Sequence, residues 1–247
     1  MSTTFNLYSN YYDLLYHDKN YRNESQYIDK LIKVNSPLAQ TVLEIGMGTG
    51  KHAEILRDFG YVIEGIELSE SMAEIARLKG LKCTVDNASN FELNKKFDVF
   101  ISLFHVISYL TDNHSLIETF KRVNNHLNKA GIFIFDVWYT PAVLNFKPET
   151  RIKRLENEVV SINRIAESVM KSNENIVDVN YEIIISEKAN NKFQRINETH
   201  SMRHFSIPEI KFLCAMTGFE LVSTEEWLTA NEPSENTWGV CFILKKI

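Results

Sequence analysis

Three glycines at alternate positions follow a short apolar segment, and this cluster constrains the fold more than any other feature. The chain contains 9 glycines in 247 residues, whereas an average usage of about 7% would give roughly 17. Gly46, Gly48 and Gly50 lie directly after the predicted strand 41–45. Gly46 permits a sharp turn, and Gly48 lets a ligand approach the backbone without meeting a β-carbon. The cluster therefore predicts a turn that binds a ligand through backbone N–H groups at the start of a helix.

Short apolar segments alternate with helical segments over the first part of the chain. The predicted strands are 41–45, 61–66, 81–85, 97–103 and 131–137, and the predicted helices among them are 52–59, 69–79 and 113–127. This alternation is typical of an α/β fold with a doubly wound, mostly parallel sheet. Ligands in such sheets bind beyond the carboxyl ends of the strands, so we expect the functional residues there.

The character of the sequence changes on both sides of this unit. Residues 24–34 are predicted to form an amphipathic helix that follows a tyrosine-rich segment, and we interpret this region as a helical lid. Beyond residue 141 the chain is polar, with β-type runs at 176–185 and 192–204 and no crossover helices. These runs predict antiparallel strands that are laid over the first unit as a cap.

The end of the chain returns to the first unit. A capping box that opens at Ser206 predicts a helix up to residue 217, and 239–245 is predicted to be a closing strand. The predicted organisation is therefore a ligand-binding domain of residues 1–141 and 205–247. Residues 142–204 are predicted to be an antiparallel β insertion that caps this domain.

Composition and charge exclude several classes of protein. Hydrophobic residues make up 44% of the chain and charged residues 24%, which is typical of a globular protein with a full core. A net charge of −5 disfavours binding to nucleic acid through a broad basic surface. Three widely spaced cysteines argue against a disulfide framework or a metal cluster, and no segment has the pattern of a membrane span or a signal peptide. We therefore expect a cytoplasmic protein without a metal site.

An acidic residue follows the glycine cluster at a spacing that indicates a ligand with a ribose. Glu67 follows the second predicted strand, 21 residues after Gly46, and a carboxylate at this place can accept hydrogen bonds from both ribose hydroxyls. An acid also disfavours a ligand with a 2′-phosphate, such as NADP. The dinucleotide fingerprint requires a glycine where this chain has Lys51, so the spacing argues against a dinucleotide.

The strand, the glycine turn and the acid together resemble the class I S-adenosylmethionine-dependent methyltransferases. The first motif of that family has the form Glu-x-Gly-x-Gly-x-Gly, which residues 44–50 reproduce. The resemblance covers residues 40–137 and implies a Rossmann-like methyltransferase fold, with the glycine loop under the methionyl and ribose groups and Glu67 on the ribose. It implies an adenine contact after the third strand, at Asn87 or at the displaced acid Asp86. The residues expected at the cofactor are Tyr21, Glu44, Gly46, Gly48, Gly50, Glu67, Leu68, Asp86, Asn87, Ala88 and Leu103.

Further segments resemble the subgroup that N-methylates amino sugars carried on thymidine diphosphate. They are a tyrosine-rich segment from Tyr12 to Glu24, an acidic and aromatic segment from Asp136 to Pro141, and the segment from Glu198 to Ser206. The chain departs from the subgroup in having Tyr109 where some members have His, and Tyr139 where they have a second Trp. Both departures fall in the expected acceptor pocket.

The residues expected to act on the acceptor are polar or aromatic. The candidate catalytic residues are Tyr12, His105, Tyr109 and His200, and the candidate substrate-binding residues are Trp138, Tyr139, Arg151, Arg154 and Arg164. Arginine side chains suit the oxygens of a diphosphate, and aromatic rings can stack on a sugar or a base. Core packing, structural hydrogen bonds and solvated charge are the alternative explanations for these residues. The four candidate bases form no recognisable triad, so we expect no single indispensable base for an amine acceptor.

These observations predict an S-adenosylmethionine-dependent methyltransferase that acts on a small molecule. The predicted acceptor is a nucleotide-linked sugar, methylated on its amino group. The alternatives are O- or N-methylation of another small polar metabolite in surface-glycan or natural-product assembly, a cofactor-binding module without catalysis, and an NAD-dependent oxidoreductase. The net charge and the lack of a basic, aromatic extension disfavour a nucleic-acid methyltransferase. We expect a monomer or a homodimer.

Overall fold

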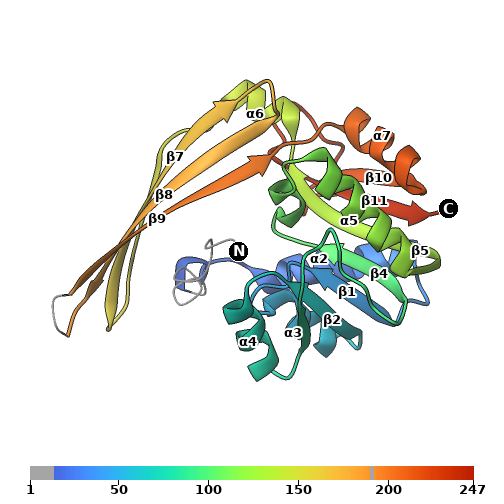
Figure 1. The fold of residues 1–247 in the computed structure, drawn as a ribbon, viewed down its shortest axis with the longest axis horizontal. Coiled ribbons are helices and arrows are strands. Elements are labelled where there is room, and N and C mark those ends of the chain that lie inside the picture. Colours follow the sequence, from blue (N-terminus) through green and yellow to red (C-terminus); the bar gives the residue numbers. More distant parts are fainter. Residues whose placement is uncertain (1–13, 190–191) are drawn as a thin grey trace.

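The computed structural model describes residues 14–189 and 192–247, which form a seven-stranded sheet and a separate four-stranded sheet (Figure 1). The larger sheet has the strand order β10-β11-β5-β4-β1-β2-β3. Its strands are β1 (Thr41–Ile45), β2 (Val62–Glu67), β3 (Lys82–Val85), β4 (Phe97–Ser102), β5 (Leu127–Trp138), β10 (Phe219–Glu226) and β11 (Gly239–Lys246). The pairs β1–β2, β1–β4, β2–β3 and β4–β5 are all parallel. This order confirms the predicted α/β fold with a mostly parallel sheet.

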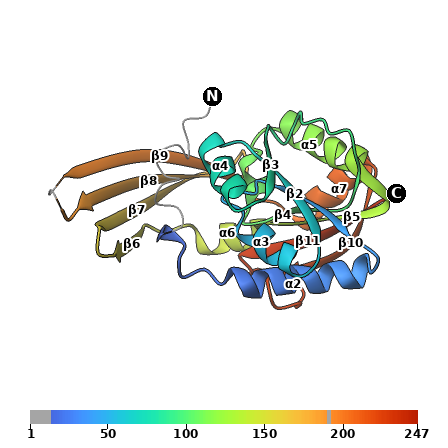
Figure 2. The same cartoon turned by 90° about the horizontal axis from the view of Figure 1, so that it is seen from below.

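Helices cover both faces of the larger sheet, as Figure 2 shows from below. They are α2 (Tyr21–Asn35), α3 (Lys51–Asp58), α4 (Glu70–Leu78), α5 (Asn113–His126) and α7 (Ile207–Thr217). The helices α2, α3 and α4 pack into one buried cluster with Ile132 and Ile134 of β5, whereas α5 and α7 pack into another with Phe133 and Phe135. Because alternate residues of β5 enter different cores, its central part is a continuous apolar run.

The last part of the chain adds an antiparallel edge to the sheet. The predicted helix is α7, which begins after Ser206, whose hydroxyl accepts a hydrogen bond from the Glu209 N–H, and ends at Gly218 with φ 76°. The predicted closing strand is β11, which pairs antiparallel with β5. The structure adds β10, which pairs antiparallel with β11 at the edge. Its sequence did not predict a strand because only Phe219 is fully buried and most of its residues are polar.

The four-stranded sheet is antiparallel and projects from the larger sheet as an arm (Figures 1 and 2). Its strands are β6 (Arg151–Glu156), β7 (Val160–Lys171), β8 (Ile176–Glu187) and β9 (Phe193–Arg203), and the short helix α6 (Thr140–Phe146) leads into it. The predicted runs 176–185 and 192–204 correspond to β8 and β9. The strands β6 and β7 were not predicted, because their frequent charged residues obscure the alternation of a strand. We call this sheet the arm; the residue limits of the two predicted domains stay a prediction.

The residues that precede α2 connect the arm to the larger sheet. Leu15 is completely buried among apolar residues of β7, β8 and β9. The Lys153 ammonium group, on β6, donates to the backbone oxygen of Leu15 at 2.8 Å and forms an ion pair with Asp18 at 2.9 Å. The predicted amphipathic helix is α2, which packs into a core of the larger sheet. The N-terminal segment therefore contacts the arm first and the larger sheet second.

Within residues 14–189 and 192–247, no helix combines the length and the apolar character needed to cross a lipid bilayer.

Candidate active site

The predicted glycine turn connects β1 to α3 at the carboxyl end of the sheet. Gly46, Gly48 and Gly50 have φ values of 69°, 58° and 79°, which glycine adopts without strain. The N–H groups of Gly46 and Met47 both donate to the backbone oxygen of Ile66, so the turn is held against β2. A β-carbon at Gly46 would lie 2.6 Å from Val106, whereas one at Gly48 would have no neighbouring atom within 4 Å. The loop is therefore packed at Gly46 and open to a ligand at Gly48.

Glu67, the last residue of β2, lies directly against this turn. Its Oε2 accepts a hydrogen bond from the Gly48 N–H at 2.8 Å, and its Oε1 accepts one from the Ser69 N–H at 2.9 Å. Burial raises the pKa of Glu67, while these backbone donors act in the opposite direction. Leu68 follows with 58% of its surface exposed. The parallel pairing of β1 with β2 thus brings the predicted glycines and the predicted acid together.

The residues after β3 lie beside Glu67, as the sequence predicts. The N–H of Asp86 donates to the backbone oxygen of Glu67 at 3.1 Å. The side-chain oxygen of Asn87 accepts hydrogen bonds from both the N–H and the hydroxyl of Ser89, each at 3.0 Å. Ala88 packs against a core cluster. Asp86 and Asn87 are both near the strand ends, and the choice between them as the adenine contact stays open.

A chain of buried ionisable groups extends from Glu44 to the N-terminal helix. Glu44 is 1% exposed, and no hydrogen-bond partner of its Oε2 is found among the described residues. Its Oε1 lies 3.7 Å from Nδ1 of His52, whose Nε2 lies 2.7 Å from Oε2 of Glu24. Lys19 forms an ion pair with Glu24, and the ring of Tyr21 lies 5.0 Å from that of His52. Burial, followed by the charge of Glu67, raises the pKa of Glu44 to about 8.

Two consecutive residues with left-handed backbone follow β4. Phe104 and His105 have φ values of 64° and 61°, which non-glycine residues rarely adopt and which concentrate at functional sites. Nδ1 of His105 lies 2.6 Å from Oδ2 of Asp136, a buried carboxylate on β5. The predicted residue Leu103 is buried just before them. Asp136 belongs to the acidic and aromatic segment described above but was not predicted as a site residue. An acid within the last residues of an apolar strand could have indicated its role.

Two of the predicted catalytic residues contact each other. The hydroxyl of Tyr109, in the 3-10 helix η1 (Val106–Tyr109), lies 2.7 Å from Nδ1 of His200 on β9. Nε2 of His200 lies 3.1 Å from Oε2 of Glu198, whose side chain is largely buried. The sequence pattern indicated no triad, because Tyr109 and His200 are 91 positions apart. Glu198 was not predicted as a site residue, and Tyr12 lies outside the described residues.

The predicted substrate-binding aromatic residues have different environments. Trp138 makes an edge contact with His105, with ring centroids 6.2 Å apart, and another with Trp238 at 5.5 Å. Tyr139 is buried in the core cluster that contains Phe205, so core packing accounts for its ring. Trp238 is a further aromatic residue beside Trp138 that sequence reasoning did not select.

The pleat of the arm separates the predicted arginines. Arg164 lies opposite Lys153 in the strand register, so both side chains share one face. The guanidinium of Arg164 donates to the hydroxyl of Tyr16 at 3.1 Å and lies over the ring of Tyr181 at 5.1 Å. Arg151 is two positions before Lys153 and shares this face, whereas Arg154 lies on the opposite one. Arg154 therefore does not join the other two predicted arginines.

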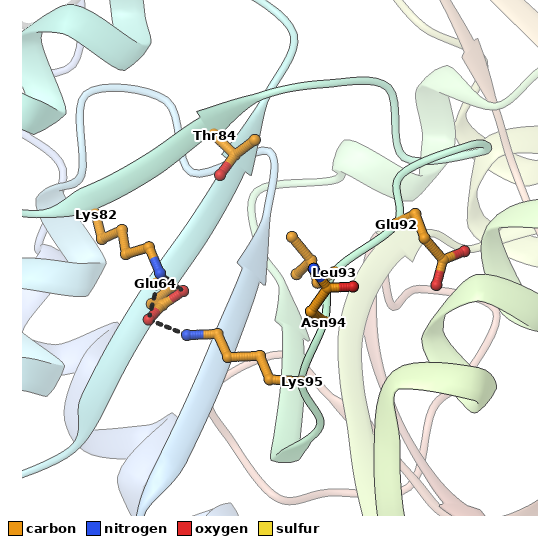
Figure 3. A pocket seen from close by; sticks show the side chains of 7 residues that line it. All are labelled: Glu64, Lys82, Thr84, Glu92, Leu93, Asn94 and Lys95. Carbon is orange, nitrogen blue, oxygen red and sulfur yellow. Dashed lines mark hydrogen bonds and ion pairs between the residues drawn. The ribbon is translucent and has the colours of Figure 1, made fainter.

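A surface pocket of about 320 Å³ lies apart from these residues (Figure 3). Glu64 of β2 forms ion pairs with Lys82 and Lys95 on its wall. The lining residues are Glu64, Lys82, Thr84, Glu92, Leu93, Asn94 and Lys95, and none of them is a predicted site residue. In the described part of the chain, no group of three or more His, Cys, Asp or Glu side chains could hold a metal ion.

Comparison with known proteins identifies the family. Residues 18–224 match the family model described as "Methyltransferase domain". The chain is 28% identical over 178 residues to the dTDP-3-amino-3,4,6-trideoxy-alpha-D-glucopyranose N,N-dimethyltransferase of Streptomyces venezuelae, covering 70% of this chain and 74% of that protein. It is 26% identical over 175 residues to the dTDP-3-amino-3,6-dideoxy-alpha-D-glucopyranose N,N-dimethyltransferase of Streptomyces fradiae, covering 69% and 68%.

The fold is similar to that of solved structures. The S-adenosylmethionine-bound structure of CalS10, an amino pentose methyltransferase from Micromonospora echinaspora, matches with a TM-score of 0.78 and 20% sequence identity. The match covers 100% of this chain and 99% of that one. The likeness therefore includes both the larger sheet and the arm.

Proposed function

The chain belongs to the methyltransferase domain family, and on this premise we propose that it N-methylates the amino group of a sugar carried on a nucleoside diphosphate. The methyl donor is S-adenosylmethionine, which supplies a reactive methyl group on a sulfonium and an adenosine ribose with two hydroxyls. The observation that carries the proposal is the contact between Glu67 and the Gly48 N–H, which joins the acid and the glycine turn at one strand end.

The residues at the glycine turn fit this donor. The open side of Gly48 admits a ligand to the loop, and the carboxylate of Glu67 can accept the ribose hydroxyls with its remaining lone pairs. Oε2 of Glu44, without a hydrogen-bond partner among the described residues, suits the ammonium group of the methionyl part. Leu68 offers an exposed apolar side chain for the adenine. We assign these residues to the donor.

The acceptor side is supported by the face of the arm that points to the N-terminal segment. This face carries Tyr181, Arg164 and His200. Trp138, the last residue of β5, packs against the same apolar cluster as Tyr181. Aromatic rings suit the sugar or the base, and the guanidinium of Arg164 suits phosphate oxygens. The two curated relatives are named as dimethyltransferases of 3-amino sugars on dTDP, which supports the same class of acceptor here.

The catalytic task is to align the two reactants and exclude water, because the donor is already reactive. The residues after β4 contribute to this task through a fixed backbone: Phe104 and His105 are held in left-handed conformations next to Asp136. Trp138 contacts His105 and limits the space beside it. We propose that these side chains position the acceptor nitrogen.

The test is incubation of the purified chain with S-adenosylmethionine and dTDP-3-amino-3,6-dideoxyglucose. We expect S-adenosylhomocysteine to form and the sugar nucleotide to gain the mass of one or two methyl groups. The 3-hydroxy analogue should remain unmodified. Methylation of the hydroxyl analogue alone would reject N-methylation, and binding of S-adenosylhomocysteine without turnover of any acceptor would favour a non-catalytic module. Binding of NAD in its place would favour an oxidoreductase.

A further inference from the structure

The two hydrogen bonds that join Tyr109, His200 and Glu198 each have a defined donor and acceptor. A carboxylate oxygen only accepts, so Nε2 of His200 must carry the hydrogen that lies between it and Glu198. In neutral imidazole the other nitrogen, Nδ1, is then an acceptor, and the hydroxyl of Tyr109 donates to it. Glu198 therefore selects the tautomer that receives a proton from Tyr109. The logic is that of a base oriented by a buried acid.

Tyr109 is the member of this hydrogen-bonded series that reaches the surface of the protein. Tyr109 is 37% exposed, whereas His200 is buried. Tyr109 is the last residue of η1, which begins directly after His105. Val106, the first residue of η1, lies against the glycine turn, where a β-carbon at Gly46 would be 2.6 Å from its side chain. The short helix that carries Tyr109 thus lies next to the glycine turn.

The groups around His200 come from several elements. Tyr109 of η1 and Glu198 of β9 make its hydrogen bonds, and the ring of Tyr181, on β8, contacts its edge with centroids 4.9 Å apart. Arg164 of β7 lies over the Tyr181 ring, 5.1 Å from its centroid. Burial, followed by Tyr16, Tyr181, Glu198 and Glu67, raises the pKa of Tyr109 well above its ordinary value. Tyr109 therefore passes a proton on and does not ionise by itself.

We propose that Tyr109, His200 and Glu198 form a proton relay that deprotonates the acceptor ammonium group before methyl transfer. This proposal rests on the proposed function. The N–H bond of the ammonium breaks as its proton forms an O–H bond with Tyr109, the original Tyr109 proton moves to Nδ1 of His200, and the electron pair stays on the amine nitrogen. That pair then forms the N–C bond while the pair of the C–S bond goes to sulfur. Tyr109 is the catalytic residue, and His200 and Glu198 are positioning residues.

The relay returns to its starting state after each turnover. The imidazolium of His200 is balanced by Glu198 while the methyl group is transferred. When the product has left, the proton returns to water through Tyr109, the residue of the relay that is partly exposed. The relay is needed only below the pKa of the acceptor amine, since at higher pH the amine already enters as the free base. The relay therefore agrees with the expectation that no base is indispensable.

The first test is the pH dependence of single-turnover methyl transfer to dTDP-3-amino-3,6-dideoxyglucose. We expect Glu198→Gln and His200→Gln to slow the reaction by about 10- to 100-fold at low pH, where the acceptor is an ammonium. The loss should shrink to within about threefold at high pH. The control is Glu182→Gln, which removes an ion pair with Arg195 on the arm and should leave the profile unchanged. An equal loss at every pH, or no loss at low pH, would overturn the relay.

The second test needs no acceptor and separates the relay from the proposed function. Nitrogen-15 NMR of the histidine side chains, with S-adenosylhomocysteine bound, should show His200 protonated on Nε2 in the wild-type protein. Glu198→Ala removes the acceptor and should change this tautomer while the affinity for S-adenosylhomocysteine stays the same. An unchanged tautomer in Glu198→Ala would contradict the relay. A wild-type protein that has the expected tautomer but methylates no amine would instead contradict the proposed acceptor.

Discussion

At the scale of single residues, two acids on neighbouring parallel strands have different tasks. Glu67 has both oxygens hydrogen-bonded to backbone N–H groups, whereas one oxygen of Glu44 has no hydrogen-bond partner among the described residues. Both are buried, and the charge of Glu67 adds to the rise in the pKa of Glu44. We infer that one acid shapes the turn around the ribose, and the other becomes charged when a cation pairs with it.

Replacing Glu67 tests the first task. Glu67→Gln removes the charge from an acceptor of hydrogen bonds, and such bonds contribute about 1.5–3 kcal/mol each. We expect the affinity for S-adenosylhomocysteine to fall by about 10- to 100-fold, measured by isothermal titration calorimetry. Glu64→Gln, on the same strand but in the surface pocket, is the matched control and should bind normally. Equal dissociation constants for the two variants would remove Glu67 from the ribose site.

Replacing Glu44 tests the second task through stability. The pKa of Glu44 is about 8 in the fold against an ordinary 4.5, so between these values the folded chain holds a proton that the unfolded chain has lost. Its contribution to stability is therefore present at low pH and is lost as the pH rises to about 8, by up to about 1.4 kcal/mol per pH unit. Glu44→Gln should be most stabilising relative to wild type near pH 8.

Melting temperatures of wild type and Glu44→Gln between pH 5 and pH 8, taken without the donor, give the measurement. Glu74→Gln replaces an exposed acid on α4 and serves as the control with a constant difference from wild type. A constant difference for Glu44→Gln as well would show that Glu44 is ionised throughout this range.

At the scale of elements, the turn from β1 to α3 uses glycine for two separate reasons. All three glycines have positive φ, but their surroundings differ. A β-carbon at Gly50 would lie 2.3 Å from Cδ1 of Leu81, inside the fold, whereas one at Gly48 would face open space. The sequence motif does not distinguish the two positions, whereas the structure shows that Gly50 is required by packing and that Gly48 leaves open space for a ligand.

Alanine at the two positions should therefore have different effects. Both variants pay about 1–2 kcal/mol for left-handed backbone, and Gly50→Ala adds about 1–3 kcal/mol of overpacking against Leu81. We expect Gly50→Ala to have the lower free energy of unfolding in urea, and Gly48→Ala to lose more affinity for S-adenosylhomocysteine at nearly full folded content. The reverse order in either measurement would contradict the assignment of Gly48 to the ligand side.

At the scale of the whole molecule, the N-terminal segment connects two sheets that have separate cores. Leu15 belongs to the apolar cluster of the arm, and Leu31 of α2 belongs to a cluster of the larger sheet. The catalytic candidates come from both parts, since Tyr109 follows β4 and His200 lies on β9. The position of the arm therefore decides whether the two side chains meet.

Truncation of Leu15 should loosen the arm selectively. Leu15→Ala removes a fully buried side chain, a change that typically costs about 2–5 kcal/mol. We expect faster amide hydrogen exchange in β7 and β8 and unchanged exchange in β4 and β5, measured by mass spectrometry. Leu31→Ala is the matched control and should accelerate exchange in the larger sheet instead. Faster exchange in both sheets in each variant would show that the two cores unfold as one.

Much of the larger sheet could be predicted, because its signals are local. The apolar run of β5 and the glycines before α3 determine a strand and a turn within a few residues. Glu67 and Gly48 could be placed together because parallel strands end at the same edge. The strands β6, β7 and β10 could not be predicted, because their polar residues hide the period of a strand.

The sequence by itself determined where the parallel strands lie along the chain, the glycine turn and the acid that follows it, since each depends on a short stretch of chain. Only the tertiary structure decided which distant side chains meet. Tyr109 reaches His200 across 91 positions, and Glu198 joins them because it lies two residues before His200 on the same face of β9. The register of β9 within the arm and the packing of the arm's base determine these contacts. No local pattern in the sequence predicts them, because they arise from the packing of β9 against η1, two elements far apart in the chain.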